Sequence, residues 1–212
     1  VSVTAEDMAG NIVASPVTKT FVLDSLAPVV SDNSIAYSEK NEKSAIPQDN
    51  NVYYSNKDVT ISTTVTERFT DKENIKITLK KGNTDIAKSL ADWMNDESVR
   101  ISVDAPTSDS NDSEWKIEFT VPIAENEEQE YSYKVEVTDY SGNTKANNEI
   151  KFCLDNVEPV AAITYTPYAS DQDFDDLANT GERIYLNAAY QSFGVDIQVK
   201  EKYFANSSKE VN

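Results

Sequence analysis

The residues of this chain best suited to chemistry are acidic, and one group of them has the spacing of a calcium-binding loop. Within residues 171–182, carboxylates occupy positions one, three, five and twelve, and an asparagine occupies position nine. The predicted ligands are Asp171, Asp173, Asp175, Asn179 and Glu182, with the carbonyl of Leu177 at position seven. Calcium takes about six to eight oxygen ligands, and this order of groups matches the loop of an EF-hand. The sequence therefore predicts Ca²⁺ as a cofactor that would order a long loop.

Two features of the same loop favour an alternative, a solvated acidic loop that binds no metal. Position six is Asp176, where the sharp turn of such a calcium loop normally requires glycine. The flanking segments alternate like strands, so no pair of helices frames the loop. Residues 38–51 occupy the equivalent place in another copy of the sequence repeat described below, and they lack the pattern altogether. A calcium site in 171–182 would therefore not be shared by every repeat of the chain.

No other set of residues supports an enzyme mechanism. The chain has no histidine and a single cysteine, which removes the commonest general base and any internal disulfide. The sequence contains no phosphate-binding glycine loop, nucleophile elbow or metalloprotease helix. A self-catalysed lysine crosslink needs a buried lysine beside a carboxylate, and strand alternation places Lys116, Lys134 and Lys151 outward. We therefore expect a protein without catalytic residues, which is not an enzyme.

The charge balance excludes further classes of partner. Acidic residues outnumber basic ones by 37 to 19, which gives a net charge of -18. Nucleic-acid binding depends on basic residues that neutralise phosphates, so we expect no nucleic acid as a partner. The negative charge suits a soluble, self-repelling surface protein and divalent cations. No apolar run approaches the length of a membrane span, so we expect no membrane insertion.

The elements that would position these groups are strands arranged in a repeat. Residues 133–143 repeat residues 1–11 in the same register, 132 positions later. Each copy continues into a similar tail, residues 21–29 and 152–160, which contains Leu-Asp and, four residues after the aspartate, a proline. A long period with a fixed ending is typical of a tandem array.

The repeated segment has the pattern of a strand followed by a tight turn. Apolar and polar residues alternate over 133–138, as in a strand with one face in water. In Asp139-x-x-Gly142, the carboxylate can accept a backbone N–H two residues on, and glycine can take a positive φ. We therefore interpret Asp139 and its counterpart Asp7 as turn formers, with a metal or catalytic role as the alternative.

Further alternating stretches predict the rest of a β-rich core. A first edge strand is expected at 29–36, followed by strands at 59–65, 75–79, 99–103, 115–121 and 150–154. The acidic run 125–130 is expected to be a solvated loop. The hydroxyl of Tyr131, at the entrance of the next strand, is expected to bond back to a nearby loop. Alternation turns Cys153 away from the side of Phe152 and Leu154; we expect it to be a small apolar residue under a neighbouring strand or loop, with an outward, reactive thiol as the alternative.

Residues 85–95 break the alternation. Their apolar side chains fall at helical spacing and predict a short helix capped by Thr84 or Asp85. Trp93 within this segment could stack on a ligand, but packing against the core is the expected role of such a large aromatic residue.

The repeated string V-x-V-T-x-D-x-[AS]-G-N, closed by L-D-x-x-x-P, resembles the tandem Ig-like (Big-type) repeats of large bacterial cell-surface and secreted proteins. The segments 53–56 and 65–69 and the position of Trp115 match the same pattern. The resemblance implies an all-β fold of tandem Ig-like antiparallel β-sandwich units.

The resemblance also implies three parts. Residues 1–25 would be the C-terminal hairpin of a preceding unit, 26–156 a complete unit, and 157–212 the N-terminal strands of a following unit. Residues 195–203 support the third part, because they repeat the apolar and acidic pattern of 61–69 at an offset of 134.

The function that this resemblance implies is a non-enzymatic stalk or spacer at the bacterial cell surface or cell wall, or in a secreted protein. Its expected partners are the neighbouring Ig-like units of the same chain. Two alternatives stay open: an adhesin-like module that binds a host protein or glycan through its loops, and an accessory module of a secreted glycan-acting enzyme.

Overall fold

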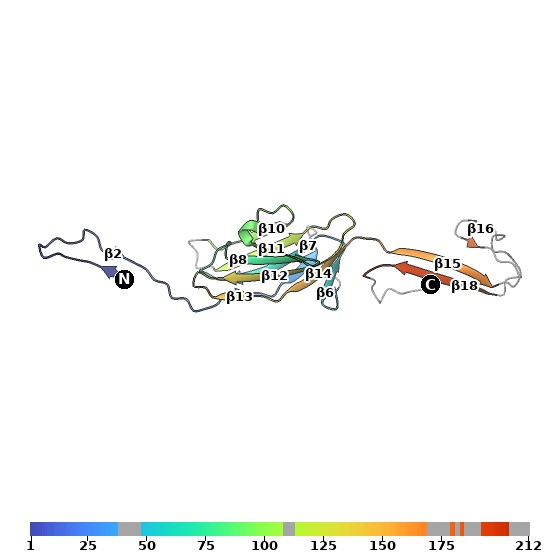
Figure 1. Ribbon diagram of the computed structural model, residues 1–212, viewed down its shortest axis with the longest axis horizontal. Helices are drawn as coiled ribbons and strands as arrows, with labels where there is room; N and C mark the ends of the chain where they lie inside the picture. The colour runs from blue at the N-terminus through green and yellow to red at the C-terminus, as the bar shows by residue number, and fades with distance from the viewer. Residues whose placement is uncertain (38–47, 108–112, 169–178, 181–182, 185–191, 204–212) are drawn as a thin grey trace. The chain divides into compact units, whose positions relative to one another are not determined.

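The computed structural model describes residues 1–37, 48–107, 113–168, 179–180, 183–184 and 192–203 of the 212-residue chain (Figure 1). The chain divides into two compact units, Val1–Asn156 and Val157–Asn212. Strands dominate both units, and the helix of the described residues is the short α1 (Leu90–Trp93) in the first unit. The predicted all-β fold class, with one short helix, is therefore confirmed.

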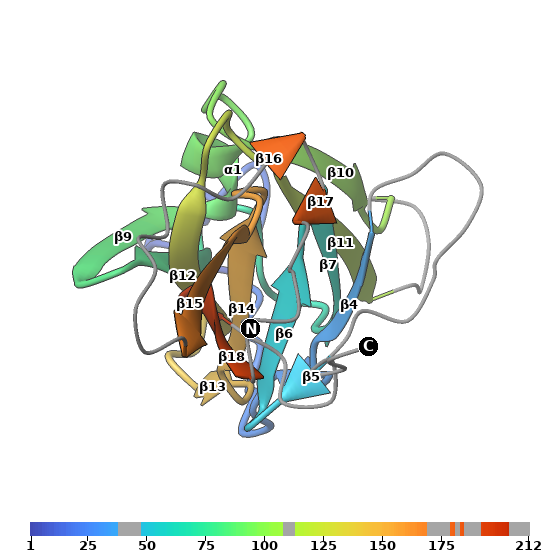
Figure 2. The same ribbon diagram turned by 90° about the vertical axis from the view of Figure 1, so that its right-hand side faces the viewer.

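Two facing sheets form the core of the first unit, and Figure 2 shows their strands in two layers. The strands of the first sheet are β3 (Val29–Val30), β4 (Ser34–Tyr37), β7 (Val59–Thr66), β10 (Arg100–Asp104) and β11 (Glu114–Val121). The strands of the second sheet are β5 (Gln48–Asp49), β6 (Val52–Ser55), β8 (Ile75–Lys81), β9 (Thr84–Ser89), β12 (Glu128–Thr138), β13 (Thr144–Ala146) and β14 (Ile150–Asp155). The order is β10-β11-β7-β3 in the first and β5-β6-β14-β12-β8-β9 in the second, with β4 also on β7 and β13 also on β12.

Alternation in the sequence explains which side chains meet between the sheets. Every second residue of β7 is buried, and Val59, Ile61 and Val65 are fully shielded from solvent. Phe119 of β11 packs between Trp93 and Tyr133, with ring centroids 5.2 and 5.1 Å away. Each such buried side chain contributes about 1.5–3 kcal/mol relative to an exposed one, so these facing strands hold the unit together.

Strand β14 has a different arrangement from the other strands. It pairs in antiparallel fashion with β12 and in parallel fashion with β6, whereas the other strand pairs among the described residues are antiparallel. The strand through which the chain leaves the first unit is therefore hydrogen-bonded on both sides.

The N-terminal hairpin lies outside this core. Its strands β1 (Ser2–Val3) and β2 (Val17–Thr18) pair with each other, and its apolar side chains are exposed. Phe21 and Leu23 are 72% and 99% exposed, whereas their counterparts Phe152 and Leu154 in β14 are fully buried. The same sequence pattern therefore has two different environments in one chain.

The second unit pairs β15 (Val160–Tyr168) with β18 (Ser192–Lys200), and β16 (Asn179–Thr180) with β17 (Arg183–Ile184). Ala161 lies opposite Val199, as Val30 lies opposite Val65 in the first unit. Residues 195–199, which were predicted to repeat 61–65, thus pair with β15 as residues of β7 pair with β3.

The prediction for residues 85–95 was wrong in extent. The segment begins as edge strand β9, because Thr84–Ser89 pairs with β8, and the helix is limited to Leu90–Trp93. Ser89 caps the helix instead of Thr84 or Asp85, and its hydroxyl accepts the N–H of Asp92. Pairing with a neighbouring strand overrides the helical spacing of the apolar residues.

Several side-chain predictions are decided by burial. Trp93 is 1% exposed and donates its indole N–H to the carbonyl of Ile77 at 2.9 Å, so it packs as expected. Cys153 is fully buried, so the expected small buried residue is confirmed and the alternative of an outward, reactive thiol was wrong. Lys116, Lys134 and Lys151 are exposed, as their alternation predicted.

Two loop and strand predictions also need correction. The expected edge strand 29–36 is divided into β3 and β4, which pair with different parts of β7. The acidic run 125–130 is not a solvated loop, because β12 begins at Glu128 and Glu127 is 7% exposed. Glu127 is tolerated there because the hydroxyl of Tyr131 bonds to its carboxylate at 2.5 Å, which is the loop contact predicted for that tyrosine.

Candidate cation site

The turn after β12 is built around the carboxylate of Asp139. Its Oδ1 accepts the backbone N–H groups of Ser141 and Asn143 at 2.8 Å each, and its Oδ2 accepts the Asn143 side-chain amide at 2.8 Å. Gly142 has φ +90°, the left-handed conformation that only glycine adopts at little cost. The prediction of an Asp-x-x-Gly turn is therefore confirmed.

These bonds keep Asp139 ionised. Burial raises the pKa of Asp139, but hydrogen bonds from Asn143, Ser141 and Gly142 outweigh it, and the pKa lies below its ordinary value of 3.8. Asp139 is 3% exposed, so its negative charge is placed in the interior of the unit.

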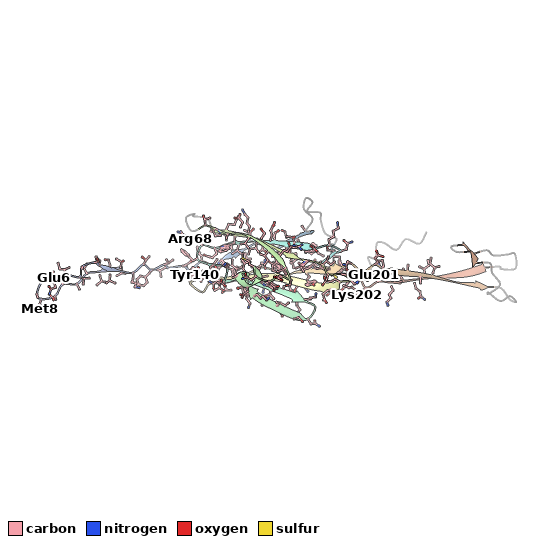
Figure 3. The ribbon with its side chains drawn as sticks, turned by 90° about the horizontal axis from the view of Figure 1, so that it is seen from above. Glu6, Met8, Arg68, Tyr140, Glu201 and Lys202 are labelled. Atoms are coloured by element: carbon pink, nitrogen blue, oxygen red, sulfur yellow. The ribbon has the colours of Figure 1, made fainter. Side chains whose placement is uncertain are left out.

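A second buried carboxylate comes from the residue directly after β7. Glu67 is 9% exposed, and its Oε1 accepts the N–H of Phe69 at 2.8 Å. The same corner recurs in the second unit, where Glu201 accepts the N–H of Tyr203 at 2.9 Å. In each copy the residue between them, Arg68 or Lys202, extends into solvent beside the aromatic ring (Figure 3).

The third carboxylate belongs to Asp24, in the segment that joins the N-terminal hairpin to β3. Asp24 is half-buried, and its Oδ1 accepts the N–H of Leu26 at 3.0 Å. The amide of Asn143 reaches the carbonyl of Asp24 at 3.4 Å and so connects this linker to the turn after β12.

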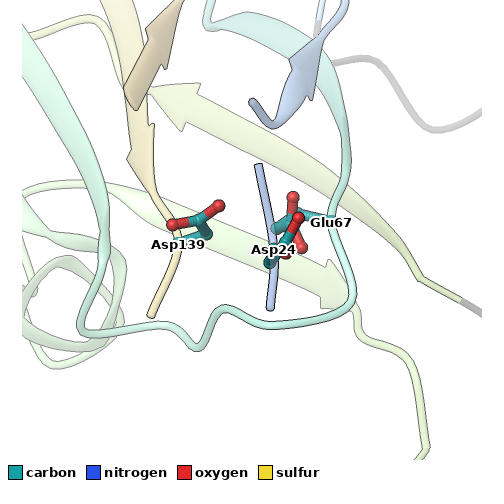
Figure 4. A group of neighbouring side chains, drawn as sticks. All are labelled: Asp24, Glu67 and Asp139. Carbon is teal, nitrogen blue, oxygen red and sulfur yellow. The ribbon is translucent and has the colours of Figure 1, made fainter. Parts of the chain in front are cut away.

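Together these residues form an acidic cluster. One carboxylate oxygen from each of Asp24, Glu67 and Asp139 lies within 4.8 Å of the other two (Figure 4). In the part of the chain that the structure describes, no lysine or arginine forms an ion pair with any of them. Three carboxylates this close repel one another in the absence of a positive charge.

A hard divalent cation is the partner that this arrangement fits best. All three donors are oxygens, which Ca²⁺ prefers, and a carboxylate can supply one or both of its oxygens. The set lacks the nitrogen and sulfur ligands that favour zinc or copper.

The predicted calcium loop is a separate matter. Asp171, Asp173, Asp175 and Glu182 lie outside the described residues, and for Asn179 only its strand, β16, is described. Calcium binding by that loop therefore stays a prediction.

Sequence reasoning did not bring Asp24, Glu67 and Asp139 together. Asp24 and Glu67 were noted only as residues of the repeat, and Asp139 was interpreted as a turn former with a metal or catalytic role as the alternative. A signal was present, because each has an acidic counterpart in another copy, namely Asp155, Glu201 and Asp7.

Comparison with known proteins gives no relative, since no family model, curated protein or solved structure matches the chain. The described residues contain no helix with the length and apolar character that a membrane span requires.

Proposed function

We propose that this chain is a non-enzymatic segment of an extracellular stalk or spacer of a bacterial surface protein, built from tandem Ig-like units. The observation that carries the proposal is that two local structures recur along the chain with their hydrogen bonds intact. One is the turn at Asp7 and Asp139, and the other is the corner at Glu67 and Glu201. Recurrence at a long period is the property of a tandem array, whose repeats mainly set length and spacing.

The strand arrangement of the first unit supports a role in bearing tension. The chain leaves this unit through β14, which is paired with β12 on one side and β6 on the other. Tension along β14 acts parallel to the strands, so it strains the hydrogen bonds to β12 and β6 at the same time, in shear. Shear resists force better than peeling, in which the bonds break one at a time.

The linker before the first unit also suits a spacer. Pro28 restricts its own φ and disfavours helical backbone at Ala27, so the segment 24–28 is stiffer than a glycine-rich tether. Asn143 holds the carbonyl of Asp24, and a cation shared by Asp24, Glu67 and Asp139 would fix the same segment to the unit.

Single-molecule force spectroscopy on the full chain tests the proposal. We expect one abrupt unfolding event for Val29–Asp155, with a contour-length gain of about 400 Å at roughly 3.3–3.6 Å per residue. Handles at Gln129 and Asn156 provide the control. Gln129 pairs with Leu154, so this geometry peels β12 from β14 and should need less force. Gradual extension without a distinct event, or equal forces in both geometries, would contradict a load-bearing role.

A second candidate function, an adhesive module, is favoured by one observation. The first unit has an open, mostly apolar cavity beside α1, which suits an apolar side chain of a host protein better than a sugar. Screening the full chain on glycan and matrix-protein arrays separates the candidates, because a pure spacer should bind nothing there.

A further inference from the structure

The cavity beside α1 has an apolar wall and a volume of about 380 Å³. It lies between the β8–β9 hairpin, α1, and the loop from β11 to β12. The apolar wall consists of Leu79, Ile86, Trp93, Val99, Val121 and Ile123. Trp93 is fixed by its bond to the carbonyl of Ile77 and by its edge-to-face contact with Phe119. The volume falls in the range of roughly 300–1,000 Å³ that small-molecule sites occupy.

Two ion pairs line the same cavity. Lys81 donates to Glu127 at 3.0 Å, and Lys88 donates to Asp96 at 2.5 Å. Each ammonium also lies over an aromatic ring of the cavity, Lys81 over Tyr131 at 5.3 Å and Lys88 over Trp93 at 4.8 Å. The lysine side chains are 49% and 37% exposed, so solvent reaches both.

The carboxylates of these pairs already have several donors. Glu127 accepts the hydroxyl of Tyr131 and the N–H of Ala124 in addition to Lys81. Burial raises its pKa, but these hydrogen bonds lower it to below the ordinary value. Hydrogen bonds from Lys88 and Ser98 likewise lower the pKa of Asp96 to about 2. Both groups are therefore ionised and well satisfied at neutral pH.

The ammonium groups keep donors to spare. Each carries three N–H donors and gives one of them to a carboxylate, and Lys81 also bonds to Tyr131. Solvent reaches the remaining donors, so the cavity offers them to the carboxylate of a ligand in place of water. The apolar wall offers too few polar groups for a sugar, which would need many hydrogen bonds.

We propose that this cavity binds a small carboxylic acid with an aromatic or branched aliphatic body. The body would pack against Ile86 and Ile123, which are partly exposed, and the carboxylate would bond to Lys81 and Lys88. The net charge of -18 repels anions at long range. We therefore expect a dissociation constant on the order of 1 mM for a ligand of this size.

Titration of the labelled full chain with 3-phenylpropionate, followed by NMR, tests the proposal. We expect saturable shifts at the Trp93 indole and at the methyl groups of Ile86 and Ile123. The neutral analogue 3-phenylpropanamide should bind at least five-fold more weakly, because it lacks the charge that the lysines recognise. Equal affinity for acid and amide, or shifts that are scattered and do not saturate, would overturn the proposal.

Two variants sharpen the test. Lys88→Met keeps the apolar stem and removes the ammonium, and it should weaken binding of 3-phenylpropionate at least five-fold. Lys76→Met is the matched control, because Lys76 is an exposed residue of β8 outside the cavity, and it should change nothing. Unchanged binding by Lys88→Met would also overturn the proposal. If that variant does not fold, the comparison of acid with amide on the unaltered chain still decides.

Discussion

The turns at Asp7 and Asp139 have the same local structure in different surroundings. In each turn the aspartate accepts two backbone N–H groups and one asparagine amide, and two backbone bonds close the loop. Gly10 and Gly142 have φ +85° and +90°. Yet the turn at Asp7 is exposed, whereas Asp139 is buried beside two other carboxylates. A short sequence is therefore enough for the turn, but not for the acidic cluster.

The residues that follow the two aspartates show the same contrast. Met8 and its counterpart Tyr140 are both exposed (Figure 3). The hydroxyl of Tyr140, however, bonds to Asp71 at 3.0 Å. The second turn thus connects to the loop between β7 and β8, and the first has no such neighbour among the described residues. Matched substitutions in the two turns can therefore separate local from tertiary contributions.

Calcium should produce the largest difference between the two turns. If the cluster binds Ca²⁺, saturating calcium should stabilise the first unit by up to about 2.7 kcal/mol at 100 times the dissociation constant. Asp24→Asn together with Glu67→Gln should abolish the gain, whereas Asp7→Asn should keep it. Without calcium the double variant should melt at a higher temperature than the unaltered chain, because it removes carboxylate repulsion.

Differential scanning calorimetry measures these melting temperatures, and titration calorimetry measures binding. Asp173→Ala with Glu182→Ala isolates any contribution of the predicted loop in the second unit. The cluster is not a calcium site if binding by the full chain does not saturate at millimolar calcium.

The second largest effect should come from the asparagine of each turn. Asn143→Ala removes the amide's bond to the Asp139 carboxylate within the turn and its bond to the Asp24 carbonyl, which joins the turn to the linker. We expect a loss of about 1–2 kcal/mol in the unfolding free energy of the first unit. Asn11→Ala removes a single bond to Asp7 in an exposed hairpin and should leave that free energy unchanged. Urea unfolding measures both, and equal effects of the two variants would mean that tertiary contacts add nothing to the turn.

The two glycines should give a smaller difference. Gly142→Ala should cost about 1 kcal/mol, because alanine adopts a positive φ only with strain. A β-carbon there meets no atom within 4 Å, so the cost is conformational and not a clash. Gly10→Ala should not alter the melting of the first unit. An unchanged melting temperature for Gly142→Ala would contradict the importance of the turn for stability.

The smallest effect should be a dependence on pH. The pKa of Asp139 is lower in the folded chain than its ordinary value of 3.8. Its contribution to stability is therefore complete above the unfolded pKa and is lost as the pH falls through the folded one. Unfolding of the two-sheet core at pH values between about 5 and 2 should show a shallower loss for Asp139→Asn than for the unaltered chain. Asp7→Asn should follow the unaltered chain, because Asp7, whose pKa is also lowered, belongs to the exposed hairpin outside that core. If stability falls with pH in the same way for the unaltered chain and both variants, the lowered pKa of Asp139 does not contribute to stability.

The sequence predicted most of the strands and few of the contacts between them. Alternation identified the cores of β7, β8, β11, β12 and β14, because a side chain in a strand has only two directions to take. The same alternation misplaced Cys153, since β14 is covered on both faces. It also missed the edge strand β9, where pairing with β8 decided the backbone against helical spacing.

The sequence by itself determined the structures held together by bonds within a few residues. These are the Asp-x-x-Gly turns, the Glu-x-aromatic corners and the alternation of the strands, and they recur wherever the same residues recur. Only the tertiary structure decided the rest. Glu67 and Asp139 are 72 positions apart, and Asp24 lies 43 positions before Glu67. Sheet pairing and the packing of Phe119, Tyr133 and Phe152 bring such distant residues together, and no local pattern encodes that proximity.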